Sequence, residues 1–71
     1  MNIEIKAPMT GKIVSIVVNL GDHVNAEDEV VIMDTMKMEI PVYAPAEGTV
    51  KEIKVKEGDS IKTDQVLMTI S

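Results

Sequence analysis

Ala7-Pro8-Met9-Thr10-Gly11 is the stretch that decides the fold, because a second copy of it, Ala44-Pro45-Ala46-Glu47-Gly48, begins 37 positions later. The same shift of 37 places Gly58-Asp59 on Gly21-Asp22, and apolar positions also match in the segments between them. The identical residues fall at turns, where a shared backbone conformation requires them. We therefore interpret the 71-residue chain as two copies of one four-strand unit.

The two copies span about residues 7–34 and 44–71, and a hairpin at about residues 35–43 joins them. We expect a single domain over residues 1–71, because a chain of this length is too short for two hydrophobic cores. It contains no cysteine, so disulfides cannot hold it and packing alone must stabilise it.

Short runs of alternating or β-branched apolar residues predict β-strands, and Val and Ile dominate the apolar composition. In the first copy and the hairpin, we expect strands at residues 2–6, 12–18, 29–34 and 38–43, with a brief paired stretch at 23–25. Pro41 cannot donate a ladder hydrogen bond, so its strand should lie at a sheet edge or end near that residue.

The second copy shows where its strands are irregular. Its apolar residues lie first at an even position, Val50, and then at odd positions, Ile53 and Val55. This change in the alternation predicts a β-bulge near Lys51-Glu52. By the repeat, another bulge is expected near Val14-Ser15.

Closing the two copies on each other would bury their apolar faces together and remove exposed sheet edges. We therefore predict an all-β fold: a flattened antiparallel β-barrel or sandwich of two four-stranded sheets related by a pseudo-two-fold axis, a barrel-sandwich hybrid. The termini should lie close together, opposite the central hairpin. The predicted core consists of Ile3, Ile5, Ile13, Ile16, Val18, Val24, Val30, Ile32, Val50, Ile53, Val55, Ile61, Leu67 and Ile70.

Charge and composition exclude several classes of function. The net charge is −5, the seven lysines are dispersed and Tyr43 is the only aromatic residue, so a nucleic-acid site is not expected. The longest apolar run is too short for a transmembrane helix, so we expect no direct membrane insertion. The absence of cysteine and of a signal-peptide pattern at the N-terminus predicts a cytoplasmic protein.

The central stretch Asp34-Thr35-Met36-Lys37-Met38-Glu39 forms the hairpin between the copies and places Lys37 at its tip. Hairpin tips usually contain Asn, Gly or Asp at the apex, and this one has none. Adaptable thioethers flank the lysine instead, as at surfaces that fit several partners. The alternative is that Met36 and Met38 belong to the core and Lys37 is an ordinary surface residue.

The rest of the chain offers little chemistry. His23 is the only histidine and has no serine or carboxylate pair arranged with it, so a nucleophilic triad is not predicted. Glu27-Asp28-Glu29 lacks the spaced ligand set of a calcium loop, and the glycines do not form a phosphate-binding cluster, so no metal site is expected. We therefore predict no catalytic residue and no independent enzyme activity.

Taken together, these motifs resemble the biotinyl/lipoyl attachment family, in particular the biotin carboxyl carrier domains of biotin-dependent carboxylases and decarboxylases. The resemblance covers essentially the whole chain. The matching motifs are Ala7-Pro8-Met9-x-Gly11, Gly21-Asp22-x-Val24, Met36-Lys37-Met38, Ala44-Pro45-x-x-Gly48 and Gly58-Asp59-x-Ile61.

The resemblance implies that Lys37 carries covalent biotin and that Met36 and Met38 are recognition residues. It implies three kinds of partner: a biotin protein ligase, a biotin carboxylase, and a carboxyltransferase or decarboxylase subunit that takes the carboxyl group. Lipoyl domains usually lack both methionines, so the pair favours biotin. The alternatives are a lipoyl carrier modified on Lys37 and an interaction module in which Lys37 stays free.

This sequence departs from the family pattern at two kinds of position. Asp34-Thr35 stands where Glu-Ala is common before the lysine motif, and Thr35 adds a β-branched hydroxyl there. The glycine often found before the fourth strand is Glu27, echoed by Asp64 in the second copy. The segment that protrudes as a thumb in some bacterial carriers is not expected, because the offset of 37 holds without an insertion.

Overall fold

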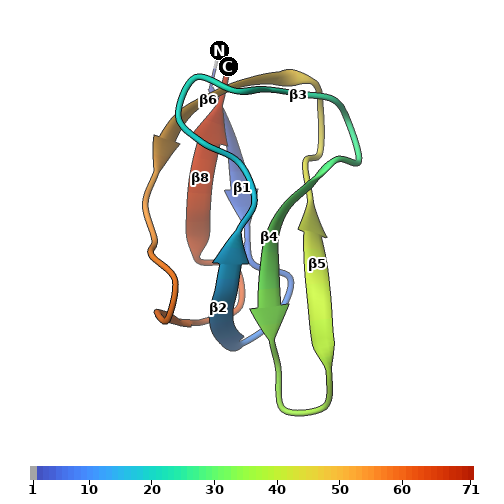
Figure 1. Ribbon diagram of the computed structural model, residues 1–71, viewed down its shortest axis with the longest axis vertical. Helices are drawn as coiled ribbons and strands as arrows, with labels where there is room; N and C mark the ends of the chain where they lie inside the picture. The colour runs from blue at the N-terminus through green and yellow to red at the C-terminus, as the bar shows by residue number, and fades with distance from the viewer. Residues whose placement is uncertain (1) are drawn as a thin grey trace.

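A computed structural model describes residues 2–71 as eight β-strands that form two layers (Figure 1). Short turns connect the strands, and Pro, Gly, Asn and Asp recur in those turns. The strands are β1 (Ile3–Lys6), β2 (Gly11–Ile16), β3 (His23–Val24), β4 (Glu29–Asp34), β5 (Glu39–Tyr43), β6 (Gly48–Ile53), β7 (Ser60–Ile61) and β8 (Val66–Ile70).

The strands form two four-stranded antiparallel sheets, in the orders β1-β8-β6-β3 and β5-β4-β2-β7. Adding 37 to the residue numbers of β2 and β4 gives β6 and β8, which occupy the equivalent places in the other sheet. One sheet therefore corresponds to the other strand by strand. The predicted all-β fold with two related sheets is confirmed. Each sheet draws strands from both copies of the repeat, so neither copy can bury its apolar face without the other.

Both predicted β-bulges are present. The register of β2 on β4 shifts between Ile13 and Ser15, and the register of β6 on β8 shifts between Val50 and Glu52. The extra residue in each strand bends it, which helps a short sheet to curve over the core. Pro41 lies in β5, an edge strand, as its missing N–H requires.

Loops that cross between the sheets lock the two copies together. The Gly21 N–H donates to Val50 O at 2.9 Å, and the equivalent Gly58 N–H donates to Ile13 O at 2.8 Å. Both glycines have positive φ, 87° and 92°, a conformation that side chains other than glycine rarely adopt. The repeated Gly-Asp pair therefore serves the contact between the sheets as well as the local turn.

The core largely agrees with the prediction, with one error. Ile32 is only partly buried and lies outside the core cluster, whereas its neighbours Val31 and Met33 are fully buried. The register of β4 on β5 shifts between Glu29 and Val31, so Val30 and Val31 both point inward and the alternation beyond them is reversed. Ile3, Ile16, Val18 and Ile53 pack against the core while partly exposed. The buried hydrophobic residues absent from the predicted set are Ala7, Val31, Met33, Val42, Ala44 and Met68.

Two non-glycine residues occupy the left-handed backbone region, and they are the positions at which the resemblance leads us to expect glycine. Glu27 has φ 72° and Asp64 has φ 68°. This conformation costs an L-residue about 1–2 kcal/mol, partly offset in a Gly variant by greater freedom of the unfolded chain. We expect Glu27→Gly and Asp64→Gly each to raise the free energy of unfolding by about 0.5–1 kcal/mol in urea titrations.

Gly21→Ala tests the same effect in the opposite direction, because it adds a side chain at a residue with positive φ. A Cβ at Gly21 would meet nothing within 4 Å, so any loss of stability comes from the positive φ alone. We expect Gly21→Ala to lower the free energy of unfolding by about 1 kcal/mol. If Glu27→Gly destabilises the protein instead, interactions of the Glu27 side chain outweigh the backbone strain.

The two ends of the molecule differ in what they present. Ile3 pairs with Ile70, so the start of β1 and the end of β8 lie together, and the β4–β5 hairpin projects at the opposite end (Figure 1). The expected placement of the termini is confirmed in this respect. Among residues 2–71, no helix is long and apolar enough to cross a membrane.

Candidate functional site

The β4–β5 hairpin forms the site and projects beyond the rest of the molecule (Figure 1). Met33 pairs with Ile40 inside the sheet, and Asp34 pairs with Glu39 as the last rung before the tip. Because Met33 is fully buried, the base of the hairpin is anchored in the core. The chain beyond Asp34 therefore extends from a fixed platform into solvent.

Thr35 closes the tip. Its backbone N–H donates to Met38 O at 2.9 Å, and its hydroxyl donates to the same oxygen at 2.8 Å. The Met38 N–H approaches Thr35 Oγ1 at 3.3 Å as a third contact. The side chain that departs from the family pattern thus stabilises the turn, a contact that alanine cannot make.

The three residues at the tip are exposed. Met36 is 103% exposed and Met38 62%, and Lys37 between them is also exposed. The alternative in which the methionines belong to the core is wrong. Within residues 2–71, the ion pairs are His23–Glu47 and Lys54–Glu52, so the Lys37 ammonium has no carboxylate partner. Its Nζ is accessible to an enzyme that must approach from outside.

A shallow apolar hollow lies beside the tip. It is lined by Met9, Thr10, Thr35, Met36, Lys37 and Thr63. The hydroxyls of Thr10 and Thr63 lie 3.3 Å apart, and two further bonds join their loops: the Ala7 N–H donates to Gln65 O and the Asp64 N–H donates to Ala7 O, both at 2.9 Å.

Met9, Thr10 and Thr63 were not predicted as part of the site. Thr10 and Thr63 are 53 positions apart in the chain, and no local sequence pattern connects them. The repeat is visible in this contact, because the loop at Asp28 contacts Ala44 in the equivalent way, with the Ala44 N–H donating to Asp28 O at 2.8 Å. The sequence shows neither contact by itself.

A family model described as "Biotin-requiring enzyme" matches residues 3–70. The chain belongs to the biotin/lipoyl attachment family.

Named relatives of this attachment domain agree with that assignment. It is 43% identical over 63 residues to the "Biotin/lipoyl attachment protein" of Bacillus subtilis (strain 168), covering 89% of this chain and 86% of the relative. It is 39% identical over 66 residues to the "Pyruvate carboxylase" of the same organism, covering 93% of this chain but only 6% of that protein.

A solved structure gives the same result for the attachment domain. The Kluyveromyces lactis urea carboxylase contains a region similar to the whole chain, with a TM-score of 0.94 and 32% identity, which amounts to 6% of that structure. The chain thus corresponds to nearly all of a small attachment protein and to a small part of large carboxylases.

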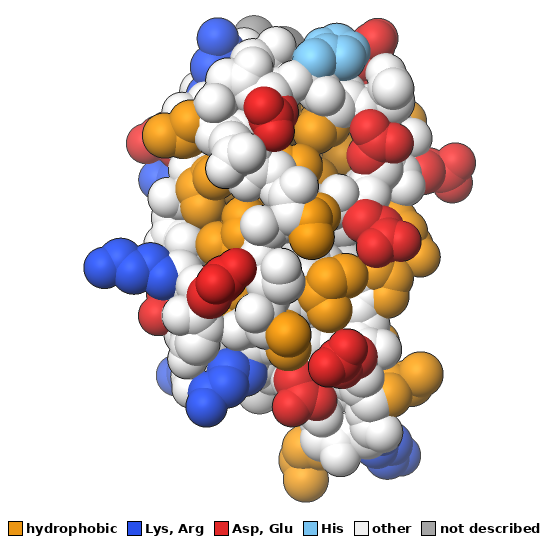
Figure 2. All heavy atoms as spheres, viewed as in Figure 1, with side chains coloured by type: hydrophobic (Ala, Val, Ile, Leu, Met, Phe, Trp, Pro, Cys, Tyr) orange, Lys and Arg blue, Asp and Glu red, His pale blue; other side chains and the backbone are white. Residues whose placement is uncertain are grey.

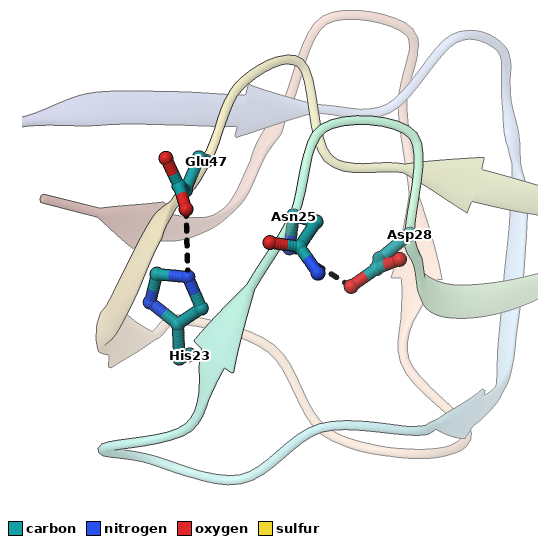
Figure 3. Close-up of polar contacts among 4 residues, drawn as sticks. All are labelled: His23, Asn25, Asp28 and Glu47. Carbon is teal, nitrogen blue, oxygen red and sulfur yellow. Dashed lines mark hydrogen bonds and ion pairs between the residues drawn. The ribbon is translucent and has the colours of Figure 1, made fainter.

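Within residues 2–71, the one histidine lies far from Lys37, and the carboxylates described below serve other contacts. His23 lies on β3 near the end of the molecule opposite the hairpin, and its Nε2 is 3.1 Å from Glu47 Oε2 (Figure 3). Both side chains are more than half exposed. The Asn25 N–H donates to Asp28 Oδ2 at 2.8 Å, so that carboxylate serves a turn. The described residues contain no group of three or more His, Cys, Asp and Glu side chains that could hold a metal ion.

Proposed function

We propose that this protein is a biotin carboxyl carrier whose Lys37 accepts biotin from a biotin protein ligase. The observation that carries the proposal is the exposed Lys37, which has no carboxylate partner among residues 2–71, at the tip of an anchored hairpin between two exposed methionines. Intact mass spectrometry of protein purified from its own organism tests it. A mass gain of one biotinyl group located on Lys37 supports the proposal, and an unmodified Lys37 in cells that contain the ligase contradicts it.

The residues present fit this modification. Nζ of Lys37, as the neutral amine, attacks the carbonyl carbon of biotinyl adenylate; the amide bond forms, AMP leaves and one proton is released. The product has no charge at this position, so the hairpin then carries a long, neutral arm. When attached, biotin supplies a ureido nitrogen that can accept and donate a carboxyl group.

The contribution of the protein is to hold that arm in place. A biotin carboxylase would load it, and a carboxyltransferase or decarboxylase subunit would unload it. A tethered group meets each active site at an effective concentration that raises avidity by about 10²–10⁴ where the geometry allows both contacts. The anchored hairpin fixes where the arm begins, and the rotatable bonds of the arm give it reach.

A lipoyl carrier is the second candidate, because the family includes both modifications. The exposed Met36 and Met38 favour biotin, since the family resemblance associates the methionine pair with biotinyl domains. Co-expression with a biotin ligase and, separately, with a lipoyl ligase distinguishes the two by intact mass. Modification by the lipoyl ligase alone would reverse the assignment.

We expect Met36→Ala to reduce kcat/KM for carboxylation of the biotinylated carrier several-fold while stability stays unchanged. Met36 is 103% exposed, so its removal leaves no cavity, and the free energy of unfolding should change by less than about 0.5 kcal/mol. Leu20→Ala is the control, because Leu20 is 63% exposed in the loop before β3. Equal kinetic losses in both variants would show that Met36 has no special role in recognition.

A further inference from the structure

The outer face of the sheet that carries the hairpin is apolar. Ser15, Ile32 and Pro41 are aligned across β2, β4 and β5 on the side away from the buried Met33. Side chains on this side are exposed at 43% for Val14, 49% for Val17 and 53% for Tyr43. We call this surface the hairpin face, and its apolar members are Val14, Val17, Ile32, Pro41 and Tyr43.

The other sheet offers an internal comparison, because the shift of 37 residues gives every position an equivalent on it. Four of the five apolar positions have a charged equivalent, and the fifth has threonine. In the same order as the members of the hairpin face, the equivalents are Lys51, Lys54, Thr69, Glu4 and Lys6. The same backbone therefore tolerates charge at four of these positions, so folding does not require apolar side chains there.

The charged residues around the two faces differ as well. Glu29 pairs with Tyr43, Asp34 pairs with Glu39 beside the tip, and Glu57 Oε2 accepts a hydrogen bond from the Ile16 N–H at 3.3 Å. Lys12, which pairs with Asp34, is the one Lys or Arg residue in β2, β4 and β5. The equivalents of these four acids are uncharged: Val66, Ser71, Asn2 and Leu20.

Figure 2 shows this side of the molecule, with hydrophobic side chains gathered where β2 and β4 lie in Figure 1 and carboxylates among and around them. An apolar centre with a charged border is typical of a protein–protein interface. The sheet that does not carry the hairpin lacks this arrangement at the equivalent positions.

We propose that the hairpin face docks the enzyme that carboxylates the arm on Lys37, through an apolar patch bordered by Lys and Arg on that enzyme. This inference rests on the proposed function. β4 and β5 run directly from the face to the tip, so a protein bound there has the arm within reach. An active site that binds the anions ATP and bicarbonate is favoured by basic side chains around its entrance, and such side chains would complement the acidic border. A second copy of this chain would place carboxylates against carboxylates.

The test uses fully biotinylated carrier and the biotin carboxylase of the same organism, after intact mass has established the modification. The double variant Val14→Lys with Val17→Lys places the residues of the opposite face on the hairpin face. We expect the KM for the carrier to rise about tenfold or more and kcat to change less than twofold. Both positions are already exposed, so circular dichroism should show an unchanged fold; Val14→Ser with Val17→Ser repeats the test without added charge.

Glu4→Gln with Glu52→Gln is the matched control, because it also adds two positive units of net charge but on the opposite face. Its KM should stay within about twofold of the wild-type value. Salt should raise the KM of the wild type, and Glu29→Lys should raise it further at low ionic strength.

Several results would overturn the proposal. The first two are an unchanged KM in Val14→Lys with Val17→Lys and an equal change of KM in that variant and the control. The third is that the lysine variant is biotinylated more slowly by the ligase but carboxylated normally. The fourth is a wild-type dimer that the two lysines dissociate. A wild-type protein that takes up no biotin would instead refute the proposed function, and the mass measurement detects that before any kinetic comparison.

Discussion

Replacing Lys37 with Arg is expected to abolish biotin incorporation while the fold stays intact. Arginine keeps the positive charge and much of the length, but its guanidinium does not form the amide. Lys37 is exposed and makes no ion pair among residues 2–71, so the free energy of unfolding should change by less than about 0.5 kcal/mol. Incubation with ligase, biotin and ATP, followed by intact mass and streptavidin blotting, measures the loss.

Lys51→Arg is the control for that experiment. Lys51 is also exposed and lies in β6, in the sheet that does not carry the hairpin. This variant should accept one biotinyl group as the wild type does. Biotin retained by Lys37→Arg would place the attachment on another lysine, and tryptic mapping would identify it.

The repeat made most of the fold predictable. A shift of 37 residues fixed which turns are equivalent, and the change of spacing after Val50 located one bulge and, by the repeat, the other. Pro41 predicted an edge strand or a strand end because it lacks an N–H, and the structure has the edge strand. These features depend on local backbone chemistry, and the sequence records that directly.

The remaining features depend on contacts between distant segments. Ile32 was assigned to the core because the apolar run from Val30 to Met33 has no polar residue to set its phase, and the register shift before Val31 decides which residues point inward. The hollow beside Lys37 brings Thr10 to Thr63, and their contact exists only once the loops meet. The hydrogen bonds of Thr35 likewise required the geometry of the tip.

The position of the lysine motif was predictable because it lies where the two copies join. What the sequence could not show is how unequal the two outer faces are in three dimensions. Val14 and Tyr43 are 29 positions apart in the chain, and pairing of β2 with β4 and of β4 with β5 places them on one surface. The carrier that we propose, handled by two enzymes in turn, would benefit from such a difference, because identical faces would let a partner bind with the arm pointing away from it.

Gly11→Ala is expected to cause the largest loss of stability among the single substitutions considered. A Cβ at Gly11 would lie 2.6 Å from the carbonyl oxygen of Asp34 and 3.3 Å from Met33 Cε. The methionine end can rotate, but the backbone oxygen ends β4 at the base of the hairpin and cannot move alone. Separating β2 from β4 there should cost about 2–3 kcal/mol.

That loss is large for this protein, because a chain of this size has a free energy of unfolding of about 4–10 kcal/mol. The melting temperature should fall by about 10 °C or more, as measured by circular dichroism. Gly48→Ala is the matched control: its Cβ would lie 3.1 Å from Ser71 O, the repeat equivalent of Asp34 O. The milder contact predicts less than half the loss, because a shift of a few tenths of an ångström relieves a contact of 3.1 Å, whereas a contact of 2.6 Å forces the two strands apart. Equal losses would show that the two sheets resist separation equally and that the base of the hairpin is not specially constrained.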